Sequence, residues 1–326
     1  MPLASPIVHH PTTFDLGPIA LTGFGVAVLF AFLIAQIVSE RELTRRGHER
    51  EAAAVSDIIF AAVLGTMLGG KLYYVLVVTH RVSDLWSRSG FVFWGGFIGS
   101  VLLCWLTIRR KKLSFLRFAD VAGIAIAAGY AVGRTGCWAI GDDYGKPYQG
   151  FLAVAFPNGS PPSTAVSMFE NFHVAIPSGV DPNSVLTVYP TQLMEVVFGF
   201  AMFLILWRLR KHTHAEGWLF GVWCVLAGAE RFVVEFFRAK DDRFGWALGL
   251  STAQLIAVAI VVTGIGIMLW RSRTKPSRRG VATAASVGLI LASACVPSRP
   301  ANAIASSSTR SQRRVHQVSV RTQRAV

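Results

Sequence analysis

Seven long apolar segments decide what this sequence can fold into. Each holds close to the ~20 mostly apolar residues with which an α-helix crosses a bilayer. A helix satisfies its own backbone hydrogen bonds in lipid, and the segments lack the alternation of barrel strands. The sequence therefore predicts an all-α polytopic membrane protein with seven transmembrane helices, at roughly 17–38, 54–79, 90–108, 118–140, 188–208, 217–238 and 248–270.

Basic residues collect in every second connection between these segments and predict the orientation. The connections at 39–53 and 109–117, together with the stretches after the fifth and seventh segments, hold seventeen Lys and Arg residues, against five in the opposite connections. By the positive-inside rule the N-terminus is periplasmic and the C-terminus is cytoplasmic. Because the net charge of +14 lies largely in these connections, we expect no nucleic acid as a partner.

Composition and cysteine usage exclude two further classes of protein. Charged residues make up 15% of the chain, against about 25% in a soluble domain. The four cysteines show no paired spacing, so neither a disulfide framework nor a zinc site is indicated. Nothing in the sequence demands a metal or an organic cofactor. The N-terminal stretch before the first segment has no Lys or Arg and so lacks the basic start of a signal peptide.

Two regions outside the spans stand out. The periplasmic connection at about 141–187 is rich in Gly, Pro, Ser and Asn, and long connections of this kind are often functional. We therefore expect a membrane domain over 1–270 that includes this loop, and a basic cytoplasmic tail over 271–326. Within the tail lies a short apolar segment, 281–294, which is too short to span a bilayer.

Charge within a membrane span is costly and usually functional, and six of the ionisable residues in the predicted spans stand out on that ground. Asp120 begins a span beside a basic connection, which favours a structural role at a helix start. Lys71 has two open interpretations, since its side chain can reach an interface or pair with an acid. The six residues are Lys71, Asp120, Arg134, Glu195, Arg231 and Glu235.

Two arginines near the outer ends of their spans suggest a site for an anion. Arg231 and Glu235 are four residues apart and so share one helix face, and Arg134 lies at a similar depth. Two arginines beside one nearby glutamate leave surplus positive charge. A phosphate group would balance this charge, and its oxygens match the geometry of the arginine N–H groups. The alternative is an internal salt bridge that only stabilises the bundle.

These charged residues lie in segments that resemble the prolipoprotein diacylglyceryl transferase family. The strongest match is the glycine-rich run at 133–147, which is similar to the signature of that family. Single motifs of this kind are weakly specific, but they follow in the family's order along matching spans. The segments are GGKLYYVL at 69–76, FWGGFIGS at 93–100, RRKKLSFLRFAD at 109–120, GRTGCWAIGDDYGKP at 133–147, YPTQLME at 189–195, RFVVEFFRAKDD at 231–242 and LSTAQ at 250–254.

The resemblance implies a reaction, a place and a set of site residues. Family members move the diacylglyceryl group of phosphatidylglycerol onto the lipobox cysteine of prolipoproteins and release glycerol phosphate, in lipoprotein biogenesis at the bacterial inner membrane. The implied partners are phosphatidylglycerol, prolipoprotein signal peptides and membrane lipids. Arg134 and Arg231 match the family's important arginines, Glu235 matches the partner of the second arginine, and Gly145 matches the required glycine.

Four positions depart from the family's usual pattern. Phe24 stands for a tyrosine, Trp94 for a histidine, Cys137 for an asparagine and Asp142 for a glutamate. Either a divergent enzyme uses another base, for which Asp142 and its neighbour Asp143 are candidates, or the chain is a catalytically altered paralogue that acts as a lipid-binding membrane scaffold.

Both candidate bases and the cysteine also have simpler interpretations. Mutual repulsion between adjacent carboxylates raises one pKa, which favours Asp142 as a base. For Asp143 a solvated turn is the favoured interpretation, and for Cys137 that of a small buried residue. A transporter is disfavoured, because its polar sites would lie at mid-membrane.

The apolar segment in the tail ends at Cys295 and follows two arginines, in an order similar to a lipoprotein signal. Self-lipidation at Cys295 is therefore a hypothesis, although the segment lies at the wrong end of the chain for a signal. An interfacial helix is the favoured alternative.

Overall fold

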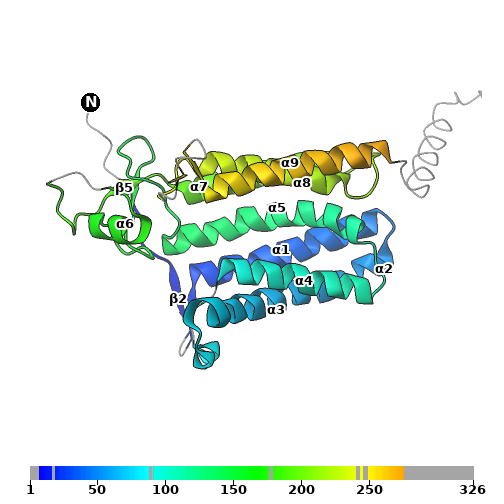
Figure 1. The fold of residues 1–326 in the computed structure, drawn as a ribbon, viewed down its shortest axis with the longest axis horizontal. Helices are drawn as coiled ribbons and strands as arrows, with labels where there is room; N and C mark the ends of the chain where they lie inside the picture. Colours follow the sequence, from blue (N-terminus) through cyan, green and yellow to red (C-terminus); the bar gives the residue numbers. More distant parts are fainter. Residues whose placement is uncertain are drawn as a thin grey trace, which may run out of the picture. The chain divides into compact units, whose positions relative to one another are not determined.

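The computed structural model describes residues 7–16, 19–87, 90, 92–175, 179–239, 243–244 and 249–274, and long helices make up most of this part (Figure 1). Each of the seven predicted apolar segments contains one long helix, as the sequence predicts. These helices are α1 (Gly23–Arg45), α3 (Val55–Tyr73), α4 (Phe93–Arg110), α5 (Phe115–Ile140), α7 (Thr191–Leu209), α8 (Trp218–Val234) and α9 (Thr252–Arg273).

Five of the described helices are long and apolar enough to cross a membrane. The α3 helix joins this group together with α2 (Glu49–Ala52) and the π-helix η1 (Tyr74–Thr79), which continue it at either end. The α4 and α8 helices are shorter, with 18 and 17 residues. The all-helical, polytopic architecture thus agrees with the sequence-based prediction. The candidate spans are Gly23–Arg45, Glu49–Thr79, Phe115–Ile140, Thr191–Leu209 and Thr252–Arg273.

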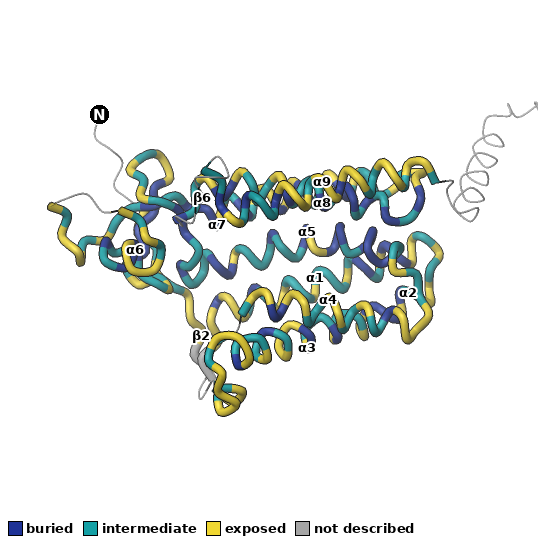
Figure 2. Tube along the Cα trace, in the orientation of Figure 1, coloured by how far each residue is buried: buried dark blue, intermediate teal, exposed yellow. Residues whose placement is uncertain are grey.

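The α5 helix is the central element of the bundle. It packs against α1, α7 and α8, while α3 pairs with α4 and α8 pairs with α9. Figure 2 shows buried residues along α5, whereas the other helices are exposed over much of their length. The buried positions of α5 are mostly alanine and glycine, so neighbouring backbones can approach it closely. Its larger core residue Ile124 packs in one cluster with Leu206 of α7 and Leu219 of α8.

Glycines also hold α3 and α4 together. A β-carbon on Gly65 would collide with the carbonyl oxygen of Gly99, and one on Gly69 would collide with that of Gly95. The two backbones therefore touch directly, as small residues on span surfaces allow. The glycines of the GGKLYY and FWGGFIGS segments thus serve helix packing, one of the roles that such residues have in membrane proteins.

Short strands and one helix organise the connection that follows α5. The strands β1 (Ile7–Val8), β4 (Val154–Ala155) and β5 (Thr187–Val188) form one sheet in that order, parallel between β1 and β4 and antiparallel between β4 and β5. Beside them α6 (Ala165–Phe172) contributes Met168 to a core with Tyr144 and Phe156. The Gly- and Pro-rich loop is therefore a small folded unit. The other short elements are η2 (Val82–Trp86), β2 (Thr13–Leu16), β3 (Ile19–Thr22), β6 (Arg243–Phe244) and β7 (Leu250–Ser251).

Two of the charged residues within spans have structural partners. Asp120 is fully buried, and its two carboxylate oxygens accept hydrogen bonds from the backbone N–H groups of Gly217 and Phe220, both at 2.9 Å. It therefore caps the start of α8, in keeping with the structural role expected from the sequence. Lys71 donates to the carbonyl oxygens of Ser87 and Asp84, at 2.7 and 3.2 Å, beyond the end of its own helix.

Replacing Asp120 with asparagine is expected to destabilise the protein by about 1–3 kcal/mol, because one buried N–H of α8 then faces an amide donor in place of an acceptor. The midpoint of thermal unfolding in detergent should fall accordingly. Asp57→Asn is the matched control, since Asp57 pairs with Lys111 at 2.6 Å with both side chains well exposed, and exposed pairs contribute ~0–1 kcal/mol. Equal midpoints for the two variants would contradict the capping role.

The predicted cytoplasmic tail is described only over 271–274, where α9 ends. The apolar segment 281–294 and Cys295 lie outside the described residues. Their proposed interfacial and lipidation roles remain predictions.

Candidate functional site

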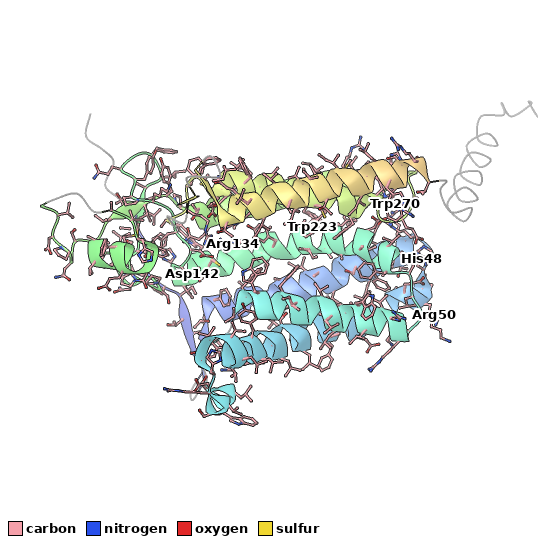
Figure 3. All side chains as sticks on the ribbon, viewed as in Figure 1. His48, Arg50, Arg134, Asp142, Trp223 and Trp270 are labelled. Atoms are coloured by element: carbon pink, nitrogen blue, oxygen red, sulfur yellow. The ribbon has the colours of Figure 1, made fainter. Side chains whose placement is uncertain are left out.

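Three helix ends and the loop after α5 bring the candidate residues together. The α5 helix ends at Gly141, which caps it in the left-handed conformation with φ +69°. The chain then turns, so that Asp142 and Asp143 follow the helix directly. Figure 3 shows Arg134 near that end of α5, with Asp142 beside it. The remaining charged groups come from the start of α7 and the end of α8.

Arg134 is the centre of the site. Its Nη1 donates to Asp143 Oδ2 at 3.0 Å and to Cys137 Sγ at 3.3 Å, and its Nη2 forms an ion pair with Glu195. Only 14% of the Arg134 side chain and 2% of the Glu195 side chain are exposed. A buried arginine between two carboxylates is held in one orientation, because its planar fork has fixed donor directions.

Asp143 bridges two arginines. Its second oxygen, Oδ1, accepts a hydrogen bond from Arg238 Nη2 at 2.6 Å. Burial would raise the pKa of Asp143, but the charges and hydrogen bonds of Arg238 and Arg134 outweigh it and hold that pKa at about 2. The sequence favoured a solvated turn for Asp143, and that interpretation was wrong, because Arg134 from the preceding helix and Arg238 from a distant part of the chain both pair with its carboxylate.

Arg231 and Glu235 form an ion pair on one face of α8. Arg231 Nη2 lies 2.6 Å from Glu235 Oε2, as their four-residue spacing predicts. Glu235 is 2% exposed at its side chain and also accepts a hydrogen bond from Ser251 Oγ, the cap of α9, at 3.1 Å. Arg231 is 34% exposed at its side chain. Of the three arginines in the site it is therefore the most accessible to a ligand.

The net charge of the site differs in sign from the positive charge that the sequence predicts. Three arginines face four carboxylates, so the surplus at this site is negative. The sequence indicates one glutamate near two arginines, because nothing in it shows that Glu195 and the turn after α5 fold back onto Arg134. The four carboxylates are those of Asp142, Asp143, Glu195 and Glu235.

Asp142 is the carboxylate best suited to exchange a proton. Burial, and then the charge of Asp143, raises the pKa of Asp142 to about 6. Its Oδ1 atom is buried without a hydrogen-bond partner among the described residues. Gln192 holds the segment in place, because its Nε2 donates to the Asp142 carbonyl oxygen at 2.5 Å. Asp142 is thus mostly ionised at neutral pH, yet close enough to its pKa to take up a proton.

Unpartnered polar atoms gather at this site. Seven buried side-chain N or O atoms of the described residues have no hydrogen-bond partner, and three of them belong to Arg134, Asp142 and Gln192. A fourth, Glu235 Oε2, has the Arg231 guanidinium at 2.6 Å as its ion-pair partner. Buried polar groups are normally satisfied, so such a concentration requires an explanation. A ligand that brings both donors and acceptors would supply the missing partners.

A thiol and two carboxylates also come within reach of one another. The ligand atoms of Cys137, Asp142 and Asp143 all lie within 4.8 Å. Arg134 and Arg238 already neutralise Asp143, and their guanidinium groups would repel a cation bound there. The cluster therefore fits the handling of a proton better than the coordination of a metal.

The positions that depart from the family pattern lie in three different environments. Cys137 is buried beside Arg134 and contributes to the site. Phe24 lies on α1, where a β-carbon on Gly136 would approach its ring to 3.3 Å. Trp94 is 47% exposed and belongs to an aromatic group on α4.

Arg238 is the site residue that the sequence reasoning missed. It contacts three acids, with Nη1 3.6 Å from Glu195 Oε1 and Nε 3.9 Å from Glu235 Oε2 besides its bond to Asp143. The signal was available, because Arg238 follows Glu235 by three residues, within the segment that resembles the family. Arg238 is the last residue of the predicted span 217–238, where a basic residue at a membrane interface is an ordinary feature, and it lies beyond the end of α8 in the structure.

Gly145 gives the site its close packing. A β-carbon there would lie 2.5 Å from the carbonyl oxygen of Phe237 and 2.6 Å from Cβ of Tyr189. Gly145 donates its N–H to the Tyr189 carbonyl at 2.8 Å and pairs with Arg238 in an isolated β-bridge. It therefore joins the loop after α5 to the segments that carry Glu195 and Arg238.

Gly145→Ala is expected to lower the free energy of unfolding by about 1–3 kcal/mol, because the added methyl group must push two backbone segments apart. The thermal midpoint in detergent measures this effect. Gly266→Ala in α9 is the matched control, since a β-carbon at Gly266 meets nothing within 4 Å. A Gly145→Ala protein as stable as the control would show that the close packing has no energetic role.

Comparison with known proteins shows the family to which this chain belongs. The family model for prolipoprotein diacylglyceryl transferase matches residues 11–270. The chain is 30% identical to phosphatidylglycerol–prolipoprotein diacylglyceryl transferases from Citrobacter koseri, Shigella boydii and Escherichia coli, over 82% of this chain and 95% of each relative. The resemblance predicted from the sequence motifs is confirmed. The chain belongs to the prolipoprotein diacylglyceryl transferase family.

Proposed function

We propose that this protein transfers the diacylglyceryl group of phosphatidylglycerol to the lipobox cysteine of prolipoproteins. The main support for this proposal is a group of arginine and carboxylate side chains where α5 and α8 end and α7 begins. Several of these side chains are buried, and some of their polar atoms have no hydrogen-bond partner among the described residues. The names of the relatives state the same donor and acceptor. The site offers cations for a phosphate and a carboxylate for a proton, which are the two needs of this reaction.

The reaction is a displacement at a glyceryl carbon. The thiol of the acceptor cysteine loses its proton, because the thiolate is the nucleophile. The sulfur bonds to the carbon while the bond from that carbon to the phosphate oxygen breaks, and the electron pair leaves on glycerol phosphate. Negative charge thus moves from sulfur to the phosphate, and correctly placed cations stabilise it there.

Arg231 and Arg134 bind the phosphate in this proposal. Arg231 is partly exposed and has one ion-pair partner on its own helix, so its remaining N–H groups can turn to a lipid headgroup. Arg134 offers its unpartnered Nε atom. Glu235 and Arg238 act as positioning residues, because Glu235 orients Arg231 and Arg238 holds Asp143 against Arg134.

Asp142 takes the thiol proton in this proposal. Its unpartnered oxygen can accept the proton, and its pKa of about 6 suits a base at neutral pH. The usual tyrosine, histidine and asparagine of the family are replaced here by Phe24, Trp94 and Cys137. Phe24 and Trp94 have no group that takes up a proton near neutral pH, so this proposal assigns the proton to Asp142.

The proposed setting is the bacterial inner membrane, crossed seven times. The α4 and α8 helices then span the bilayer beside the five longer candidates, with the N-terminus periplasmic and the C-terminus cytoplasmic. The alternate distribution of basic residues supports this topology. With this topology the site lies at the outer leaflet. The proposed membrane domain comprises residues 1–270, and a cytoplasmic tail follows over 271–326.

Complementation tests the proposal in cells. The chain is expressed in a bacterium depleted of its own prolipoprotein diacylglyceryl transferase, with a reporter prolipoprotein followed by mass. We expect the reporter to gain one diacylglyceryl group with this chain and no modification with Arg134→Ala. A well-expressed protein that leaves reporters from both the host and its own source unmodified would favour the scaffold alternative.

A further inference from the structure

A second group of arginines lies at the opposite end of the bundle, where α1 and α7 end. The α7 helix begins at the transferase site and finishes here, so the two sites are separated by its length. Figure 3 shows His48, Arg50 and Trp270 at this end, away from Arg134 and Asp142. The transferase chemistry proposed above does not use this group.

Glu42 anchors the group and is fully occupied. It is 1% exposed, and it accepts hydrogen bonds from Arg45 at 2.5 and 2.8 Å and from Arg46 Nε at 2.7 Å. Arg45 Nη2 also donates to the carbonyl oxygen of Arg210 at 3.3 Å, which joins the end of α1 to the end of α7. Both oxygens of Glu42 are thus taken, while donors remain.

The remaining donors are unpartnered and buried. Arg46 Nη2 and His212 Nδ1 are buried without a hydrogen-bond partner among the described residues. Burial, followed by the charges of Arg46 and His214, lowers the pKa of His212 to about 4. The His212 ring is therefore neutral at pH 7, and its tautomer can place the single N–H at Nδ1.

The guanidinium group of a third arginine, Arg210, lies over the ring of Trp207. The Arg210 guanidinium carbon lies 3.4 Å from the centre of the Trp207 ring, a cation–π contact through the face of the guanidinium, whose N–H groups point along its edges. The three arginines of this group, Arg45, Arg46 and Arg210, outnumber the two acids near them, Glu42 and Asp120. Both oxygens of each acid already accept hydrogen bonds, those of Asp120 from the start of α8. One net positive charge remains, and the exposed Arg208 and Lys211 add to it.

We propose that the ends of α1 and α7 form a binding site for the phosphate of an anionic phospholipid, held by Arg46, Arg210 and His212. A phosphodiester supplies acceptor oxygens for the unpartnered nitrogens and the missing negative charge. The site lies where a span meets the headgroup layer, and Trp207 is a side chain typical of that interface. Anionic lipids are attracted to basic segments at such positions.

Lipid titration of the purified full-length protein in neutral detergent tests the site. The thermal midpoint is followed against phosphatidylglycerol, phosphatidylcholine with the same acyl chains, and inorganic phosphate. Phosphatidylglycerol is also the substrate proposed for the transferase site, so one component of its stabilisation should persist in every variant. We expect a second saturable component whose half-saturating concentration is at least about tenfold higher in Arg46→Gln and Arg210→Gln, because each variant loses one charge-assisted hydrogen bond.

Arg109→Gln is the matched control. Arg109 is exposed and lies 5.1 Å from the centre of the Trp105 ring at the end of α4, where no buried unpartnered atom occurs among the described residues. All three variants keep the transferase site, so a loss confined to Arg46→Gln and Arg210→Gln reports on the second site alone. If Arg46→Gln does not fold, Arg210→Gln still provides the comparison.

The outcomes separate the sources of phosphate. Stabilisation by inorganic phosphate that is lost in the same two variants would support the phosphate chemistry and identify a free anion as the ligand. Equal stabilisation by phosphatidylcholine and phosphatidylglycerol, or equal half-saturation in all three variants, would overturn the proposal. Because neither readout depends on transfer, failure here leaves the proposed function untouched.

Discussion

Replacing Arg231 with lysine is expected to lower kcat/KM for diacylglyceryl transfer by about 10²–10³, the effect of removing one donor to a developing oxyanion. Lysine keeps the positive charge and can still pair with Glu235, so the fold should survive. It loses the planar fork that binds two phosphate oxygens at once while one N–H group stays on the glutamate. The loss therefore falls on catalysis rather than on stability.

Purified protein in detergent, assayed with phosphatidylglycerol and a lipobox peptide, gives this number directly. Arg208→Lys provides the control, because Arg208 is exposed at the opposite end of the bundle. The thermal midpoint of each variant shows whether it is folded. Full activity of Arg231→Lys would mean that a point charge suffices, and it would exclude bidentate recognition of the phosphate by this residue.

Asp142→Asn is expected to reduce transfer by about 10²–10⁴, the usual contribution of a general base. Asparagine has nearly the same shape and keeps the backbone contact with Gln192, so only proton uptake is lost. Glu170→Gln, on an exposed face of α6, removes a carboxylate outside the site and should leave transfer unchanged. Activity of Asp142→Asn equal to that control would assign the proton to another group.

The pH profile gives a second test of Asp142. A base acts only when deprotonated, so kcat/KM should rise as the pH increases through about 6. The residual activity of Asp142→Asn should lack this rise. A rise that persists in the variant would show that another residue titrates there.

The same pKa predicts a dependence of stability on pH. The folded pKa of Asp142, about 6, lies above its ordinary value of 3.8, so the folded protein binds this proton more tightly than the unfolded chain. This contribution to stability is complete below pH ~4 and is lost as the pH rises through about 6. Asp142→Asn should remove that component from the thermal midpoint measured against pH.

Much of the fold could be predicted from the sequence, because apolar length alone determines where a helix can cross lipid. All seven predicted segments contain a long helix, and the spacing of Arg231 and Glu235 correctly placed them on one helix face. The small folded unit after α5 was not predicted, since its strands have two residues each and carry no periodic signal.

Most members of the site could be predicted from the sequence, whereas Arg238 and the balance of charge could not. Arg134 and Asp142 were identified from charges and motifs, whereas the partners of Arg134 depend on how the turn after Gly141 points. A left-handed residue at that cap sends Asp143 back toward the helix that it follows. Charge that is surplus along one helix is therefore compensated by side chains from elsewhere in the chain.

Transfer by the purified protein tests the central claim most directly. The protein is placed in vesicles of phosphatidylglycerol with a peptide that carries a lipobox cysteine, and both products are followed by mass spectrometry. We predict that the peptide gains one diacylglyceryl group on sulfur while an equal amount of glycerol phosphate appears, and that Asp142→Asn and Arg231→Lys lose both products together. A folded protein that yields neither product would contradict the proposed reaction and leave a lipid-binding role.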